Sequence, residues 1–247
     1  ADVPSEIIGR AKHIYSIYDK MAKRGREFNE IYDLTALRVI CDRSGEAGTR
    51  GTTAERRREA AQAAEILGAQ ELEFLALGDG ALRTGPEEED QVIAILRRMR
   101  PELILGPATV DRHPDHERAH TLVAAACFYA GLARRGTGTP HRPAAHFTYM
   151  QNDSFEPSFV VDVTATWEIK MRALDAYGTQ LHPSRGESNP ADGPVTKISS
   201  RETRLAIEGR ARHYGDQIGA EFGEPYLSRR TLAVADPAGA KKALKAR

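Results

Sequence analysis

The chain has 247 residues, of which 40% are hydrophobic and 28% are charged, and 35 basic residues balance 35 acidic ones. These values are typical of a soluble globular protein with one large or two small domains, and they give no sign of a nucleic-acid or membrane partner. Two cysteines are too few for a disulfide framework, no apolar stretch reaches membrane-spanning length, and the first residues lack a signal core, so we expect a cytoplasmic protein.

Helices and strands alternate along most of the predicted chain. A basic amphipathic helix is expected over residues 5–26, then a strand over 37–41 and a glycine-rich loop over 45–52. The next helix begins at a capping box of Thr52 and Glu55 and ends at Gly68. Further strands are expected at 71–76, 102–106, 145–149 and 159–163, and further helices at 86–99, 116–133, 166–177 and 201–218. This alternation predicts an α/β, Rossmann-like fold with a mostly parallel sheet and helices on both faces.

The densest group of side chains that could act in catalysis or metal binding is Asp111-Arg112-His113-Pro114-Asp115-His116, between the strand at 102–106 and the following helix. In open α/β sheets, ligands bind outside the carboxyl ends of the strands, and this stretch occupies such an end. Two imidazoles and two carboxylates can bind a metal ion, move a proton, or do both. A polar surface turn in which Pro114 only starts the next helix is the structural alternative.

Other histidines give weaker signals. His120 follows His116 by four residues, so a local three-histidine metal site with His113 remains an alternative. The isolated histidines, including His146 and His213, are expected to be structural. The basic residues of the 5–26 helix form either an anion-binding surface or a solvated helix face.

Several longer blocks follow one another in the order found in a known family. They are Gly45-Glu46, Gly48-Thr49-Arg50-Gly51-Thr52, Arg112-His113-Pro114-Asp115-His116, Pro157-Ser158-Phe159-Val160-Val161-Asp162-Val163, Tyr177 with Gln180, and Arg210-Ala211-Arg212-His213-Tyr214-Gly215. On these blocks, the chain from about Val39 onward resembles the LmbE-like, or PIG-L, zinc deacetylases. Within that family it is most similar to the subgroup that deacetylates N-acetylglucosaminyl-malate in bacillithiol biosynthesis.

The resemblance implies a zinc-dependent amide hydrolase that acts on an N-acetylated amino-sugar conjugate, in a protein that forms a homo-oligomer. It implies that His116 is a metal ligand and that His113 stabilises the oxyanion or protonates the leaving amine. Asp115 would orient one of the imidazoles. Arg50 and Arg112 would contact the sugar or the malate carboxylates.

The first part of the chain departs from that family. There, a His-Pro-Asp-Asp segment supplies two further zinc ligands and the general base, and this sequence contains no such segment. Residues 5–40 instead resemble a piece of the RelA/SpoT ppGpp synthetase domain, on Gly9 to Met21, Ile31 to Leu34 and Arg38 to Ile40. That resemblance implies phosphate contacts by Arg10, Lys12, Ser16 and Lys20, and magnesium binding by Asp33.

The sequence therefore predicts a hybrid of three parts. Residues 1–38 form a synthetase-like helical segment, 39–236 an N-terminally incomplete deacetylase domain, and 237–247 a basic tail. A foreign helix replaces the first strand of the family fold, which is usually central, so unpaired backbone groups are expected beside the gap. We expect impaired deacetylation. A nucleotide-binding fragment and an inactive chimera are the alternatives.

Overall fold

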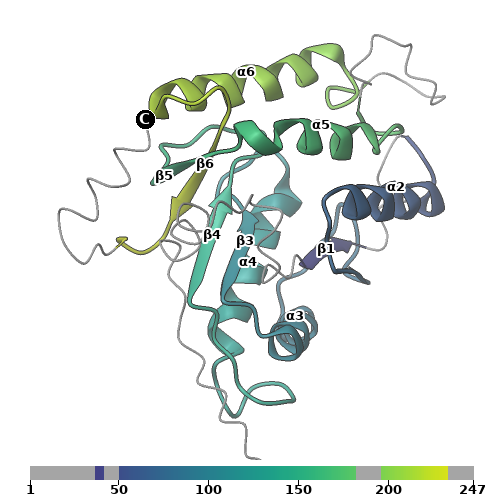
Figure 1. Ribbon diagram of the computed structural model, residues 1–247. Coiled ribbons are helices and arrows are strands. Elements are labelled where there is room, and N and C mark those ends of the chain that lie inside the picture. Colours follow the sequence, from purple (N-terminus) through teal and green to yellow (C-terminus); the bar gives the residue numbers. More distant parts are fainter. Residues whose placement is uncertain (1–36, 42–49, 182–195, 233–247) are drawn as a thin grey trace, which may run out of the picture.

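A computed structural model describes residues 37–41, 50–181 and 196–232, with side chains from Arg50 onward (Figure 1). The strands are β1 (Leu37–Cys41), β2 (Glu71–Leu75), β3 (Leu103–Pro107), β4 (Ala145–Tyr149), β5 (Phe159–Asp162) and β6 (Gly223–Ser228). The helices are α2 (Thr53–Ile66), α3 (Pro86–Met99), α4 (Pro114–Tyr129), α5 (Trp167–Asp175) and α6 (Arg201–Ile218), with a 3-10 turn at Thr164–Thr166. None of the described helices is long and apolar enough to cross a membrane.

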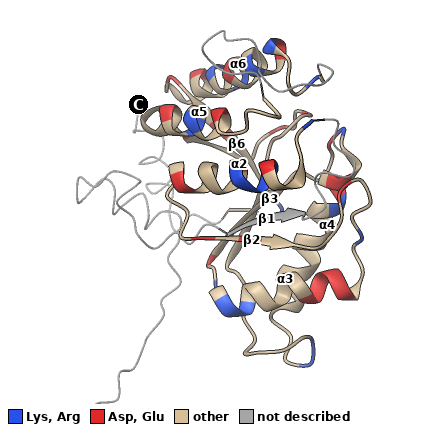
Figure 2. Ribbon diagram, turned by 90° about the vertical axis from the view of Figure 1, so that its right-hand side faces the viewer, with Lys and Arg blue, Asp and Glu red and all other residues tan. Residues whose placement is uncertain are grey.

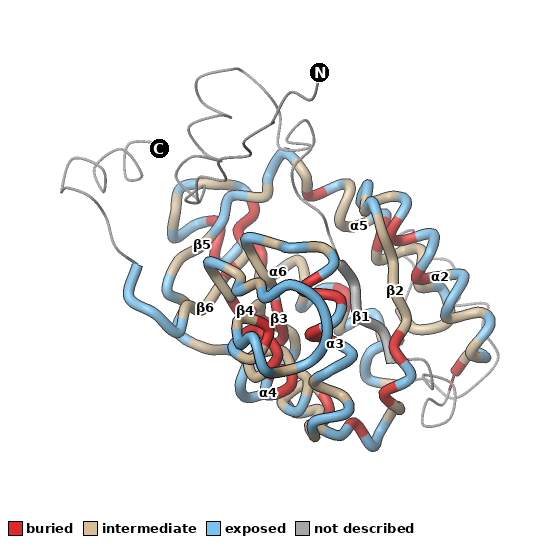
Figure 3. The backbone as a smooth tube through the Cα atoms, turned by 90° about the horizontal axis from the view of Figure 1, so that it is seen from below, coloured by how far each residue is buried: buried red, intermediate tan, exposed pale blue. Residues whose placement is uncertain are grey.

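The described strands form two separate sheets. β1 pairs with β2 in parallel, and a second sheet has the order β3-β4-β6-β5. β3 is parallel to β4, whereas β6 runs antiparallel to both β4 and β5. Figures 2 and 3 both place β1 between β2 and β3, so β1 and β3 are the neighbouring edges of the two sheets. Among the described residues, neither edge has a second strand partner.

Helices cover both faces of the strands. α3 and α4 pack against each other on one face, where α4 also contacts β3 and β4, while α2 and α5 pack together on the other face (Figure 2). α6 lies across β5 and β6. It approaches β6 closely because two glycines meet there: a Cβ added to Gly223 would lie 2.7 Å from the backbone nitrogen of Gly215.

The main apolar core lies between α3, α4 and the strand ends (Figure 3). Ile93 is completely buried there, and Leu96 and Leu122 are almost so. Leu75 of β2 is part of this core and Ile104 of β3 packs against it, so among the described residues it is side-chain packing that joins the two sheets. A smaller core of Trp167, Ala211 and Phe222 holds α5 and α6 together.

Most of the predicted elements are confirmed, with ends shifted by a few residues. The capping box at Thr52 is present, since the Thr52 side chain accepts from the Glu55 amide and the Glu55 carboxylate accepts from the Thr52 amide. The sheet is less parallel than predicted because β6 was missed. That strand begins Gly223-Glu224-Pro225, and glycine and proline argue against a strand in sequence patterns. The predicted helix at 5–26 lies outside the described residues.

His146 on β4 should make the fold sensitive to acid. Its Nε2 is buried and has no hydrogen-bond partner among the described residues, and burial, helped by nearby His120 and Arg229, lowers its pKa to about 4. The unfolded chain protonates this group near pH 6.5, so the unfolded state binds more protons between pH 6.5 and 4, and stability falls as the pH falls through that window.

Urea unfolding at several pH values would measure this effect. We expect His146→Leu to lose less stability than the unchanged protein between pH 6.5 and 4. His213→Leu, at an exposed position, is the matched control and should keep the full pH dependence. An unchanged pH dependence in His146→Leu would contradict the assignment.

Candidate active site

The predicted hexapeptide connects the carboxyl end of β3 to the first turn of α4. Pro114 occupies the first helical position, which suits proline because no amide donor is needed there. His113 is the N-cap, and its Nδ1 accepts a hydrogen bond from the Asp115 amide at 3.2 Å. The surface-turn alternative is therefore correct about Pro114, but the turn also carries a connected polar cluster.

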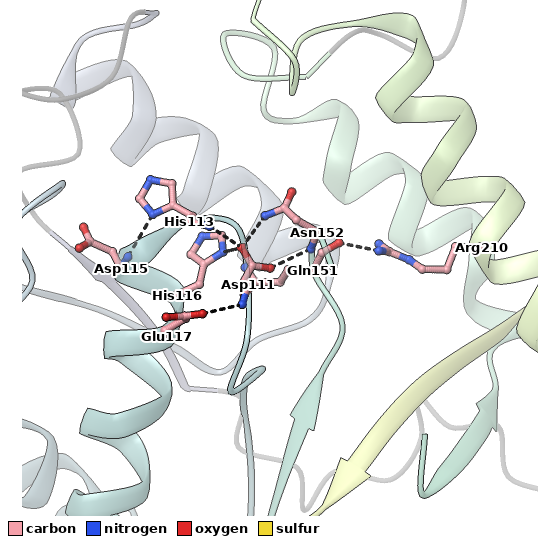
Figure 4. Close-up of polar contacts among 8 residues, drawn as sticks. All are labelled: Asp111, His113, Asp115, His116, Glu117, Gln151, Asn152 and Arg210. Carbon is pink, nitrogen blue, oxygen red and sulfur yellow. Dashed lines mark hydrogen bonds and ion pairs between the residues drawn. The ribbon is translucent and has the colours of Figure 1, made fainter. Parts of the chain in front are cut away.

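Asp111 is the centre of that cluster (Figure 4). Its buried Oδ1 accepts from the His113 amide at 3.0 Å and from Nδ2 of Asn152 at 2.8 Å, and its Oδ2 accepts from the Asn152 amide at 2.9 Å. Burial alone would raise the pKa of Asp111, but these bonds and one from His116 together lower it to about 2. Asp111 is therefore a carboxylate at any ordinary pH, and it ties the ends of β3 and β4 together.

The two imidazoles of the hexapeptide have opposite tautomers. Nδ1 of His116 lies 2.9 Å from Oδ1 of Asp111, and an ionised carboxylate can only accept, so Nδ1 of His116 carries a proton and, in the neutral ring, Nε2 offers a lone pair. In His113 the acceptor is Nδ1, so the proton of the neutral ring sits on Nε2. The rings stack with centroids 4.8 Å apart. A hydrogen-bond donor and a base thus lie side by side at the carboxyl end of β3.

Asp115 has an anchoring role in the structure. Its carboxylate accepts from the amides of Gly80 and Leu82 at 2.6 and 3.3 Å and from Arg118 at 2.8 Å. Burial opposes ionisation, but Arg118 and the two amides outweigh it and lower the pKa of Asp115. Among the described residues its carboxylate makes no hydrogen bond to an imidazole. It fixes the start of α4 to the loop after β2.

The other predicted site residues lie around this cluster or outside the described chain. Arg50 is buried, with Nη1 3.3 Å from Oγ of Ser199, and Arg112 is exposed. His120 does not join the imidazole pair, because it stacks on His146 and its Nδ1 lies 3.0 Å from the Pro107 carbonyl oxygen. The predicted nucleotide contacts, Arg10, Lys12, Ser16, Lys20 and Asp33, lie outside the described residues and remain a prediction.

The described residues do not by themselves fit a catalytic zinc. Such a site usually takes three protein ligands and one water, and no group of three or more histidine, cysteine or acidic side chains in the described ranges could hold a metal ion. His116 offers Nε2, and Asp111 fixes its ring as an outer carboxylate does in metal sites. The described part of the chain thus supplies one ligand and its support.

Three residues of the site were not predicted as site residues from the sequence. Asn152 and Gln151 follow β4 as the hexapeptide follows β3, and the carboxyl ends of parallel neighbours meet at one sheet edge. That spacing was visible in the sequence and could have indicated them. Arg210 of α6 donates from Nη1 to the Gln151 carbonyl oxygen at 2.5 Å, a long-range contact that no local pattern predicts.

Comparison with known proteins relates the chain to a family model and to a solved structure. The model of the family PIG-L: GlcNAc-PI de-N-acetylase matches residues 31–127. The crystal structure of the conserved protein TT1542 from Thermus thermophilus superposes with a TM-score of 0.71 at 30% identity, covering 89% of each chain.

Three curated relatives each match part of the chain. Diacetylchitobiose deacetylase of Thermococcus kodakarensis is 29% identical over 147 residues, 56% of this chain and 54% of that protein. The 4-oxalmesaconate hydratase of Pseudomonas putida is 30% identical over 167 residues, 60% of this chain and 64% of that protein. A GTP pyrophosphokinase of Streptomyces coelicolor is 52% identical over 42 residues, 17% of this chain and 5% of that protein. The chain thus covers less than two thirds of the length of each.

Proposed function

This chain belongs to the PIG-L family, and from that premise we propose that it hydrolyses the acetamide of an N-acetylated amino-sugar conjugate, releasing acetate and a free amine. The similarity to a diacetylchitobiose deacetylase supports an N-acetylated sugar as the substrate class. The observation that carries the proposal is the pair of stacked imidazoles with opposite tautomers at the carboxyl end of β3.

Amide hydrolysis needs both kinds of group that the pair presents. The Nε2 proton of His113 can be donated to the carbonyl oxygen as it becomes an oxyanion, or to the nitrogen as the amine leaves. The lone pair on Nε2 of His116 can hold a metal ion or accept a proton from water, and Asp111 stabilises the ring when it carries positive charge.

Zinc is the metal that we propose, and it would supply an activated water and polarise the acetyl carbonyl. His116 would be its ligand from the described residues. Because three protein ligands are the rule and the described chain supplies one, we expect weak zinc binding and slow turnover. Arg50 and Arg112 are proposed contacts to the substrate, and N-acetylglucosaminyl-malate is the proposed conjugate.

Acetate release tests this proposal. The full chain, with zinc in excess, should release acetate slowly from N-acetylglucosaminyl-malate or N,N′-diacetylchitobiose. His116→Ala and His113→Phe should each reduce that rate by about 100-fold or more, as removal of an acid or base usually does.

His213→Ala is the matched control and should keep the rate, because His213 is exposed on α6. A chelator should remove the activity, and added zinc should restore it. If acetate release continued unchanged in both the His113 and His116 variants, the imidazole pair would not be the active site.

Water addition to an unsaturated acid is a second candidate. The observation that favours it is the 30% identity to a hydratase over 60% of the chain. The same donor and base could protonate one carbon and activate water for the other. Loss of absorbance of a conjugated unsaturated acid, with no acetate released from N-acetylated sugars, would favour this candidate over deacetylation.

A further inference from the structure

One face of β3 carries a large apolar side chain that is open to solvent. Leu105 is 50% exposed although it lies in the middle of the strand. The next residue, Gly106, faces α4, because a Cβ added there would lie 3.6 Å from Cγ1 of Val123. Neighbouring residues of a strand point to opposite faces, so Leu105 points away from α4. β3 is therefore covered by a helix on one face and open at Leu105 on the other.

The open area lies on the side of β3 that faces β1. Phe147 of β4 is the in-register partner of Leu105 on the same face, yet Phe147 is only 4% exposed. The other edge of β3 has no strand partner among the described residues, and β1 is its neighbour there (Figure 3). A single exposed leucine is common on protein surfaces, but a leucine in the middle of a strand and beside a free edge marks a surface suited to another segment.

The chain itself has a segment that begins beside this surface. Residues 1–36 lie outside the described residues, and they directly precede β1, which begins at Leu37. Residues 22–36 alone span about 50 Å when they are extended, whereas neighbouring strands are about 5 Å apart. A segment that ends at Met21 can therefore reach the open face of β3 without any change in β1.

The helix predicted over residues 5–26 has two different faces. Its apolar stripe, called the Ile14 stripe below, repeats at spacings of three and four residues and consists of Ile14, Ile17, Tyr18 and Met21. Lys12, Ser16 and Lys20 follow one another at intervals of four and lie on the opposite side at 3.6 residues per turn. A helix that packs by the Ile14 stripe thus keeps these lysines in water.

We propose that the Ile14 stripe docks on the open face of β3 at Leu105, so that the N-terminal segment is an integral part of the folded domain. Docking removes apolar surface of both partners from water, which is the dominant favourable term in such packing. Lys12, Ser16 and Lys20 stay accessible to an anion in the docked state. The proposal goes beyond deacetylation and holds equally for an inactive chain.

A double-mutant cycle in the full chain, measured by urea unfolding, tests the contact. Leu105→Ala should raise the unfolding equilibrium constant by about 10-fold or more, because it truncates a side chain that the stripe buries. Ile17→Ala should raise the constant by a smaller factor in the Leu105→Ala background than in the unchanged protein. The two factors should differ by about 3-fold or more, because both substitutions remove the same contact.

Each side of the contact has a matched control. Leu67, at the end of α2, is 52% exposed, so Leu67→Ala should change the constant by less than about 3-fold and should not couple with Ile17→Ala. Lys20→Ala, on the opposite side of the predicted helix, should not couple with Leu105→Ala. Leu105→Val removes less of the side chain, and it takes the place of Leu105→Ala in the cycle if that variant does not fold.

Amide hydrogen exchange gives a second readout. The amides of residues 14–21 should exchange about 10-fold or more slowly in the unchanged protein than in the Leu105 variant. Additive effects of the Ile17 and Leu105 substitutions would overturn the proposal, as would equal exchange in the two proteins. Coupling that disappears on dilution, together with a dimer in gel filtration, would assign the open face to a second copy of the chain and would also overturn it.

Discussion

Zinc content should rise to about one ion per chain when residues 1–36 are replaced by a segment that supplies a strand ending in His-Pro-Asp-Asp and a helix leading back to β1 at Leu37. β1 and β3 are neighbouring edges without a second partner among the described residues, and both are parallel to their existing neighbours. A parallel strand between them would place its carboxyl end beside His116. Acetate release should increase by several orders of magnitude, because water bound to zinc ionises near neutral pH.

The control is the same replacement with Ala-Pro-Ala-Ala in place of His-Pro-Asp-Asp. It should gain stability in urea, because the two edges are now paired, but it should bind no more zinc than the original chain. Zinc is measured by elemental analysis after gel filtration. If both replacements fold and neither gains zinc, His116 is not part of a metal site.

Replacing Asp111 by alanine should destabilise the fold by about 3 kcal/mol or more, a large value for one substitution. The change leaves the amide of His113, both nitrogen donors of Asn152 and Nδ1 of His116 without their acceptor. It also releases the His116 ring, so any remaining deacetylation should disappear with it. Urea unfolding and acetate release measure the two effects. Asp153→Ala, one residue after Asn152 and exposed, should change neither.

The ionisation of Asp111 should also make the stability of the fold depend on pH in the acid range. Its pKa is about 2 in the fold against 3.8 for an unperturbed aspartate, so its contribution is complete above about pH 4 and is lost as the pH falls toward 2. The shift corresponds to about 2 kcal/mol. Asp111→Asn should remove this part of the acid sensitivity, and an unchanged profile between pH 4 and 2 would argue against the hydrogen-bonded carboxylate.

Local patterns in the sequence predicted the hexapeptide well. The strand before it, Pro114 at the first helical turn and the polar side chains between them are all encoded within a few residues, and so is the capping box at Thr52. The roles inside the hexapeptide were less predictable. The resemblance implied that Asp115 orients an imidazole, but Asp111, four residues earlier, is the carboxylate that contacts His116. Which carboxylate reaches the ring depends on the geometry of the turn, and the sequence pattern does not give that geometry.

Contacts between distant segments account for what the sequence did not show. Asn152 reaches Asp111 across 41 residues and Arg210 reaches Gln151 across 59. The position of Asn152 after a strand could have marked it as a site residue, but no local pattern pairs it with Asp111 or pairs Arg210 with Gln151. β6 was missed for a related reason. Pro225 is unfavourable in a strand by local rules, yet β4 and β5 flank this segment on both sides and determine its conformation.

The interruption between β1 and β3 also affects how cooperatively the molecule unfolds. In an unbroken sheet, each strand is hydrogen-bonded to its neighbours and tends to unfold with them. Among the described residues, by contrast, side-chain packing joins the β1–β2 unit to the remainder, through Leu75 in the main core and through the contact of α2 with α5. Packing of this kind can open without breaking a single backbone hydrogen bond between strands. The β1–β2 unit can therefore detach as a subglobal step while the β3-β4-β6-β5 sheet stays intact, so Asp111 and His116 belong to the part that persists longest.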